Sequence, residues 1–325
     1  MNKRFWKNKT VLVTGFEGFL GSHLTRQLLS LGAKVVGLDI RVNRKETILS
    51  ELDYKKLIVV KGSVTNYKLI GDTLDKFGID IVFHLAAEAI VGRSLKKPLN
   101  TFSSNIKGTW NILEACRHSP RVKAVVIASS DKAYGAHRKL PYKEDYALCG
   151  KHPYDVSKSC ADLLAHSYFH TYGLSVVITR CGNIYGPGEY NFSRIVPDSI
   201  RRIISNKPVV IRSDGNYTRD YVYVDDIVYG YLLLAQTLQK LNLAGKAFNL
   251  SAESPITVLE LVKKICAIAG KHTECKILNK AKYEIRDQYL SAGKAREILG
   301  WQPKYTLESG LKKTIRWYND LFKND

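Results

Sequence analysis

The sequence predicts an α/β fold in which a doubly wound parallel sheet is followed by a smaller α+β lobe. Short β-branched runs alternate with amphipathic helical segments through the first half of the chain, as in successive βαβ units. After about residue 181 the strands become short and lie scattered between helices. We therefore expect a sheet domain at 1–180 and a lobe at 181–325, with some segments such as 212–240 returning to the first domain.

The expected strands are six continuous apolar runs, which suit strands buried on both faces of a parallel sheet. They are residues 10–13, 33–38, 57–60, 79–83, 124–127 and 175–178. The spacing of apolar residues predicts the helices that connect them, near 19–31, 67–77, 100–117 and 154–172. In the lobe, helices are expected near 193–205, 226–240, 257–269 and 307–322.

The charge of the chain is its most unusual bulk property. Among 325 residues there are 50 Lys and Arg against 30 Asp and Glu, a formal net charge of +20. This excess admits nucleic acid, an anionic membrane surface or an acidic ligand as a partner. Neither a DNA-binding motif nor an apolar run long enough for a membrane span is found in the sequence. We therefore expect no nucleic-acid or membrane partner. The motifs below assign a few of the positive charges to acidic ligands, and most of the excess is expected to belong to the solvated surface.

The six cysteines stand singly, without a Cys-x-x-Cys pair or the spacing of a metal site. The sequence therefore predicts a reduced cytoplasmic protein with no bound metal.

A glycine-rich turn follows the first predicted strand and opens the first helix. Gly15 permits a tight turn, Gly18 lets the backbone approach a pyrophosphate, and Gly21 lets the helix pack on the strand. Asp39 lies 18 residues after Gly21, at the end of the second strand. Its carboxylate is placed to accept hydrogen bonds from an adenosine ribose and to repel a 2′-phosphate. The turn thus predicts a dinucleotide site that prefers NAD, although Arg41 and Arg44 are placed to weaken this preference.

Further motifs carry a family resemblance. They are His84-Leu85-Ala86-Ala87, Asn105-Ile106-Lys107-Gly108-Thr109, Ser129-Ser130 and Tyr154-Asp155-Val156-Ser157-Lys158. Together with the Gly-x-x-Gly-x-x-Gly turn they resemble the extended short-chain dehydrogenase/reductases, the nucleotide-sugar epimerases and dehydratases. The resemblance implies an NAD-binding Rossmann domain, a lobe that binds a nucleotide diphosphate sugar, and a homodimer that pairs the 100–117 and 154–172 helices. The cofactor-binding residues that it implies, beyond the three glycines and Asp39, are Phe19, Leu20, Ser63, Leu85, Ala86, Ala87, Asn105, Tyr154 and Lys158.

A tyrosine and a lysine form the predicted redox pair. Tyr154 and Lys158 are four residues apart on a helical pattern, so they share one helix face. A lysine ammonium near a phenol lowers the tyrosine pKa, which would let Tyr154 take a hydroxyl proton. Ser130 follows the fifth strand and is expected to hydrogen-bond the substrate hydroxyl and the phenolate.

The residues after Ser130 point to a particular reaction. Ser130-Asp131-Lys132-Ala133-Tyr134 resembles the CDP-glucose branch of the sugar 4,6-dehydratases. Elimination of water across C5 and C6 needs an acid at the C6 hydroxyl, for which Asp131 is suited, and a base at C5. Lys132 would serve as this base if burial or cationic neighbours kept it neutral. Glu144 and Tyr154 are the alternative bases.

The lobe contains the residues that the resemblance assigns to the substrate. They are Asn183, Arg194, Arg219 and Arg286, and the arginines suit a diphosphate because a guanidinium donates paired N–H groups. Gly186-Pro187-Gly188-Glu189 and Asp220-Tyr221 differ from the CDP-glucose branch, and the second is typical of general epimerases. The sequence therefore predicts an NAD-dependent nucleotide-sugar 4,6-dehydratase, with a nucleotide-sugar 4-epimerase as the alternative.

Overall fold

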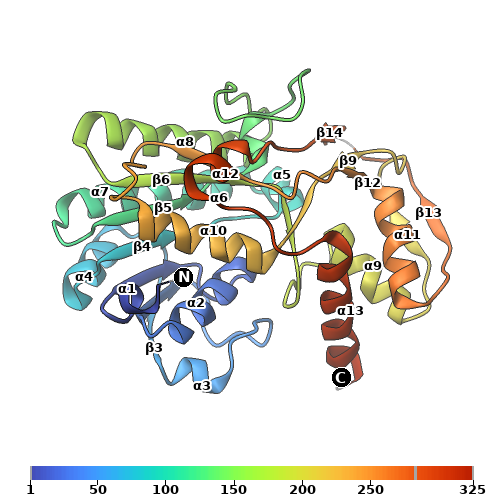
Figure 1. Ribbon diagram of the computed structural model, residues 1–325, viewed down its shortest axis with the longest axis horizontal. Helices are drawn as coiled ribbons and strands as arrows, with labels where there is room; N and C mark the ends of the chain where they lie inside the picture. The colour runs from blue at the N-terminus through green and yellow to red at the C-terminus, as the bar shows by residue number, and fades with distance from the viewer. Residues whose placement is uncertain (1, 282–283, 324–325) are drawn as a thin grey trace.

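The computed structural model describes residues 2–281 and 284–323, and a seven-stranded parallel sheet forms its centre (Figure 1). The strand order is β3-β2-β1-β4-β5-β6-β11. The strands are β1 (Thr10–Thr14), β2 (Lys34–Asp39), β3 (Leu57–Lys61), β4 (Ile81–His84), β5 (Ala124–Ala128), β6 (Val176–Cys181) and β11 (Ala247–Leu250). Every residue of β1 is buried, as expected for a strand covered on both faces. The predicted doubly wound α/β fold is confirmed, and β11 adds a seventh strand to the six predicted.

Helices cover both faces of the sheet, and each face has its own apolar core. One layer contains α2 (Phe19–Ser30) and α10 (Val224–Thr237), which contact each other. The other contains α4 (Tyr67–Phe77), α7 (Gly108–His118) and α8 (Pro153–Tyr172). Both α10 and β11 come from the chain after residue 181 and pack with the first-half sheet.

The helix expected near 100–117 is divided in the structure. It consists of α6 (Pro98–Phe102), a π-helical turn at Ser103–Lys107, and α7, and it follows the short helix α5 (Val91–Lys96). The π turn contains Asn105, whose side chain is buried. A π turn inside a helix adds a residue to one turn, and such turns are frequent at functional sites. Apolar spacing alone does not reveal this break.

The lobe lies at one end of the sheet, on the right in Figure 1, around a third apolar core. Its helices are α9 (Ile195–Ile204), α11 (Val258–Ala269) and α13 (Leu307–Lys323). Its short strands pair as β7 (Asn183–Tyr185) with β10 (Tyr221–Tyr223), β8 (Val209–Ile211) with β13 (Cys275–Ile277), and β9 (Thr218–Arg219) with both β12 (Ile256–Thr257) and β14 (Asp287–Gln288). The remaining helices are α1 (Lys3–Lys7), α3 (Glu51–Tyr54), α12 (Gly293–Leu299) and a 3-10 turn at Asp131–Tyr134.

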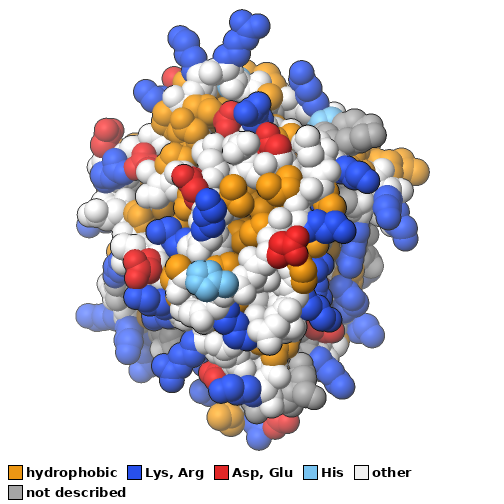
Figure 2. Space-filling model, turned by 90° about the vertical axis from the view of Figure 1, so that its right-hand side faces the viewer, with side chains coloured by type: hydrophobic (Ala, Val, Ile, Leu, Met, Phe, Trp, Pro, Cys, Tyr) orange, Lys and Arg blue, Asp and Glu red, His pale blue; other side chains and the backbone are white. Residues whose placement is uncertain are grey.

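On the lobe face the basic side chains are spread and do not form one patch (Figure 2). Figure 2 shows Lys and Arg around the rim of the lobe face, with hydrophobic side chains gathered near its middle. Within residues 2–281 and 284–323, no helix combines the length and the apolar character needed to cross a bilayer.

Candidate active site

The turn between β1 and α2, residues 14–21, is called the cofactor turn below. Gly15 has a φ of +72°, and a Cβ at this position would lie 2.9 Å from the backbone N of Ala86. A Cβ on Gly21 would lie 2.0 Å from the carbonyl oxygen of Gly15. Helix α2 begins after Gly18, and no side chain of the described residues caps it. Its first N–H groups therefore remain available to an anion, so the turn fits the pyrophosphate of the predicted NAD.

The residues at the end of β2 form the adenosine side of this site. Asp39 is buried and accepts a hydrogen bond of 2.7 Å from the Arg44 guanidinium. Glu17, a buried residue of the cofactor turn, accepts hydrogen bonds from the backbone N–H groups of Asn43 and Arg44 and from the Tyr54 hydroxyl. Glu17 thus ties the loop after β2 to the cofactor turn. The sequence analysis overlooked this role because the partners lie 26 to 37 residues away.

The other predicted cofactor residues lie around the same edge of the sheet. Phe19 and Leu20 form the first turn of α2, and Leu85, Ala86 and Ala87 follow β4. The backbone N–H groups of Leu85 and Ala86 donate to Thr14 Oγ1, each at 3.2 Å.

Two of the predicted cofactor residues make hydrogen bonds to other segments of the protein. The Asn105 amide is bonded to the backbone of Glu88 and to Ser157 Oγ, and Ser63 Oγ lies 2.8 Å from Thr65 Oγ1. Asn105 therefore fixes the loop after β4 against α8.

Tyr154 and Lys158 lie one turn apart near the start of α8, beside the end of β5. The Lys158 ammonium donates to the carbonyl oxygen of Ala128 at 2.7 Å, and burial lowers the pKa of Lys158 to about 8. Burial raises the pKa of Tyr154 to about 12, against the charge of Arg194 and a hydrogen bond with Ser130. The cation that lowers this pKa most is thus Arg194.

Ser130 and the 3-10 turn that follows it, Asp131–Tyr134, are together called the reaction turn below. Ser130 Oγ donates to Asp131 Oδ1 at 2.9 Å and accepts from the backbone N–H of Lys132 at 3.2 Å. Burial raises the pKa of the Asp131 carboxyl above its ordinary value. Burial, assisted by the nearby Arg219 charge, lowers the pKa of Lys132. The structure thus provides both conditions, burial and a cationic neighbour, that a neutral lysine requires.

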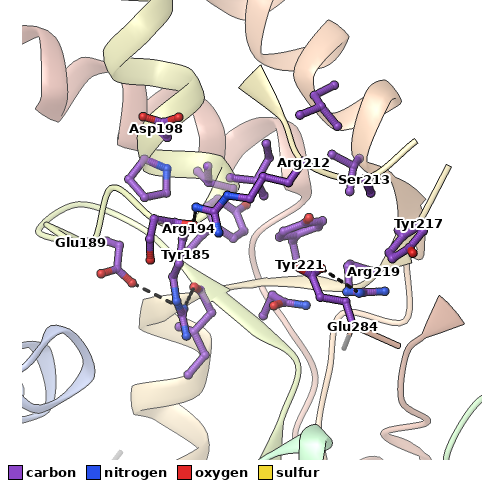
Figure 3. Close-up of a pocket in the computed structure, with 18 of the residues that line it drawn as sticks. Tyr185, Glu189, Arg194, Asp198, Arg212, Ser213, Tyr217, Arg219, Tyr221 and Glu284 are labelled. Atoms are coloured by element: carbon purple, nitrogen blue, oxygen red, sulfur yellow. Dashed lines mark hydrogen bonds and ion pairs between the residues drawn. The ribbon is translucent and has the colours of Figure 1, made fainter. Parts of the chain in front are cut away.

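A cavity of about 180 Å³ opens in the lobe beside this centre (Figure 3). Asn183, Arg194 and Arg219 line it, as do several aromatic and aliphatic side chains. Arg194 donates to the carbonyl oxygen of Ile184 at 3.2 Å and pairs with Glu189 at 3.4 Å. Arg286 is exposed and stands outside the described lining residues. Three of the four predicted substrate residues are therefore brought together.

Arg219 is held in place by the chain that crosses it. Its guanidinium donates to the carbonyl oxygens of Ile285 and Arg286, at 2.5 and 2.7 Å. The contribution of Arg286 to the site in this structure is thus its backbone carbonyl.

A buried polar network behind the reaction turn was not foreseen from the sequence. Arg180 of β6 binds Asp162 of α8 through two hydrogen bonds of 2.8 and 2.9 Å, and it also donates to the Tyr134 hydroxyl. Tyr134 in turn donates to Asn249 Oδ1, and the backbone N–H of Asn249 donates to Glu144. The network ties the reaction turn to α8 and β11. Glu144, one of the alternative bases, is thus bonded within this network.

A dinucleotide turn at the switch point of a parallel sheet, with a Tyr and a Lys one helical turn apart beside it, defines a short-chain dehydrogenase/reductase. The sequence model of the GDP-mannose 4,6-dehydratase family matches residues 12–314. The chain belongs to this family, and the predicted group of nucleotide-sugar epimerases and dehydratases is confirmed. It is therefore an enzyme of the dehydratase or epimerase kind.

The similar proteins include both activities. The chain is 32% identical to a UDP-glucuronate 4-epimerase of Thermodesulfobacterium geofontis, over 94% of this chain and 95% of the relative. It is 29% identical to a CDP-glucose 4,6-dehydratase of Salmonella typhimurium, over 100% and 94%.

Solved structures give the same picture. The UDP-glucose 4-epimerase of Thermotoga maritima has a TM-score of 0.88 at 30% identity, covering 96% of this chain and 99% of the other. A dTDP-glucose 4,6-dehydratase of Streptomyces venezuelae, solved with NAD bound, has a TM-score of 0.86 at 29% identity, covering 96% and 97%. The bound NAD of that structure supports the predicted cofactor.

Proposed function

We propose that this protein is an NAD-dependent nucleotide-sugar 4,6-dehydratase. The observation that carries the proposal is the placement of Asp131 and Lys132 next to each other in the reaction turn, beside Ser130 and Tyr154. Burial favours the uncharged form of both side chains, a carboxylic acid that can give a proton and an amine that can take one. A 4-epimerase needs neither group, because it breaks no bond at C5 or C6.

The residues divide the reaction between them. When bound, NAD supplies the acceptor for the C4 hydride and the donor that returns a hydride to C6. Tyr154 takes the proton of the C4 hydroxyl, which Ser130 orients, and Lys158 holds the nicotinamide ribose. Lys132 then takes the C5 proton, which the C4 ketone acidifies. Asp131 protonates the leaving C6 hydroxyl, which departs as water, and Lys132 gives a proton back to C5 when C6 is reduced.

The substrate would lie with its diphosphate in the lobe cavity. Arg194 and Arg219 line this cavity and supply the positive charge for a diphosphate, and Asn183 supplies an amide. The charge of Arg194 lowers the pKa of Tyr154, which supports a diphosphate position next to the reacting sugar. We expect the sugar ring to lie between the cavity and the reaction turn.

The alternative is a nucleotide-sugar 4-epimerase. Asp220-Tyr221 favours it, since the sequence follows the general epimerase pattern at these two residues. The similarity to a UDP-glucuronate 4-epimerase favours it as well. In that reaction Tyr154 would act alone, and the hydride would return to the opposite face of C4.

A panel of CDP-, UDP-, dTDP- and GDP-sugars, incubated with the protein and NAD, separates the two activities. A dehydratase gives a product that has lost water by mass spectrometry and that absorbs in the ultraviolet in alkali, as 4-keto-6-deoxy sugars do. A C4 epimer of unchanged mass, without this absorbance, would establish the alternative.

We also propose a homodimer that pairs α7 and α8 with their symmetry mates. Large apolar side chains are exposed along this side, namely Leu99 on α6, Trp110 on α7 and Leu163 on α8, which are 79%, 43% and 57% exposed. Light scattering measures the mass in solution, and we expect Leu163→Lys to lower it from a dimer to a monomer.

A further inference from the structure

Gln288, the last residue of β14, contacts the reaction turn from 156 residues away. Its side chain is fully buried, and its Oε1 accepts a hydrogen bond of 2.5 Å from Lys132 Nζ. Because Nζ donates to Oε1, the carboxamide oxygen faces Lys132 and the amide nitrogen faces away. Neither the sequence motifs nor the family resemblance singled out this residue.

The amide nitrogen of Gln288 is unpaired. Among the residues that the structure describes, none accepts a hydrogen bond from this buried Nε2. A buried donor without a partner costs free energy, so such groups usually have a ligand or water to bind. The carboxamide therefore contacts Lys132 through its oxygen, and its amide nitrogen is available to bind an oxygen of a ligand.

The backbone fixes where this carboxamide lies. Strand β14 pairs with β9 in parallel, and Gln288 is the register partner of Arg219. Arg219 also holds the preceding carbonyls of Ile285 and Arg286. The strand that carries Gln288 is thus anchored by the same arginine that lowers the pKa of Lys132.

Several charged groups face Lys132, and they act in opposite directions. Arg219 on β9 disfavours the ammonium, while Asp131 on the reaction turn, Asp155 on α8 and Glu284 before β14 favour it. Gln288 makes the short contact to Nζ, and its acceptor is neutral. A neutral acceptor orients an amine without adding a negative charge that would keep the amine protonated.

We propose that Gln288 is a positioning residue that holds the Lys132 nitrogen facing the substrate without adding a charge, while its amide N–H groups bind an oxygen of the sugar. This inference rests on the proposed dehydration. In that step the Lys132 nitrogen gains the C5 proton, the C6–O bond breaks, and the leaving hydroxyl takes the proton of Asp131 to form water. Gln288 forms and breaks no covalent bond.

The test is the titration of Lys132 in the full-length protein. Trace acetylation with acetic anhydride across a pH series, quantified by peptide mass spectrometry, gives the protonation midpoint of this one lysine. Gln288→Glu keeps the shape and an acceptor but adds a charge, and it should raise the midpoint by at least one pH unit, a tenfold change in proton affinity. Gln288→Met removes the acceptor, and it should lower the midpoint. Gln302→Glu, the same change at an exposed position, should leave it unchanged.

A general disturbance of the fold would not shift the Lys132 midpoint in opposite directions in the two variants. The pH profile of dehydration by Gln288→Glu should lie higher than that of the wild type, by the same shift as the midpoint. A midpoint that is the same in all variants overturns the inference. A wild-type enzyme that dehydrates no sugar overturns the proposed function instead, and the acetylation series still decides the Gln288 contact.

Discussion

The cofactor turn and the reaction turn lie at the same edge of one sheet, yet they are held in different ways. The cofactor turn is set by backbone packing, since a Cβ on Gly15 or Gly21 would meet main-chain atoms. The reaction turn is held by side chains from distant segments, with Arg180 bonded to Tyr134 and Gln288 to Lys132. A turn fixed by its own backbone is robust to changes elsewhere, whereas the reaction turn depends on partners 46 to 156 residues away.

The largest expected effect comes from breaking the support of the reaction turn. Arg180→Ala leaves Asp162 buried without its cation and Tyr134 without a donor. Removing one partner of a buried ion pair costs about 3–5 kcal/mol, so we expect a loss of this size in the free energy of unfolding. Chemical denaturation followed by circular dichroism measures it.

An exposed ion pair of the same geometry provides the control. Arg117 also binds a carboxylate, that of Glu114, through two hydrogen bonds, but its side chain is 32% exposed. Exposed pairs contribute about 0.2–1 kcal/mol, so Arg117→Ala should cost far less than Arg180→Ala. Equal losses would mean that burial of the Arg180 pair does not matter.

The next largest effect is expected in the cofactor turn. Gly21→Ala places a methyl group 2.0 Å from the Gly15 carbonyl oxygen, which forces the backbone apart. Such overpacking costs about 1–3 kcal/mol, and we expect NAD affinity, measured by calorimetry, to fall with it. Gly71→Ala in α4 is the matched control, since no described heavy atom beyond its excluded neighbours lies within 4 Å of the added Cβ. There alanine should stabilise the helix by roughly 0.5–1 kcal/mol.

A buried histidine beside the cofactor turn predicts a pH dependence. His84 Nδ1 lies 2.8 Å from Thr14 Oγ1, a hydroxyl that already accepts from two backbone N–H groups and so donates to the ring. Burial, with the charge of Lys158, lowers the pKa of His84 to about 3 from 6.5. The unfolded chain therefore binds a proton that the folded chain refuses between these pH values, and acidification through this window destabilises the fold.

The size of this effect is bounded by one proton. The slope is at most about 1.4 kcal/mol per pH unit, so His84→Asn should recover roughly 1–2 kcal/mol relative to wild type between pH 7 and pH 5. Denaturation at both pH values measures the difference. The exposed His272, changed to Asn in the same way, should show no such gain. A gain at His272 as large as at His84 would contradict the assignment.

The two turns also differ in how far the sequence predicts them. The cofactor turn is local, so three glycines between a strand and a helix were sufficient to place it. The reaction turn was placed by Ser130 and its neighbours, but Arg180, Asn249 and Gln288 were missed, since no local pattern links residues that meet only in the fold. The same reason explains the overlooked β11, whose place in the sheet depends on a long crossover.

The smallest expected effect concerns the choice between NAD and NADP. Arg44 binds Asp39 at 2.7 Å, so the carboxylate that would repel a 2′-phosphate has a cation beside it. Arg44→Gln removes this cation and leaves Asp39 to act alone. Because the pair is partly exposed, its contribution is small, about 0.5–1 kcal/mol.

We expect NADP affinity to fall by a few-fold while NAD affinity stays nearly constant, since only NADP carries the phosphate. Calorimetric titration with each cofactor measures the ratio, and an equal fall for both would show that Arg44 supports the adenosine site as a whole. Because Arg44 also reaches Glu17, such a result would place the loop after β2 with the cofactor turn, as one unit held by Glu17.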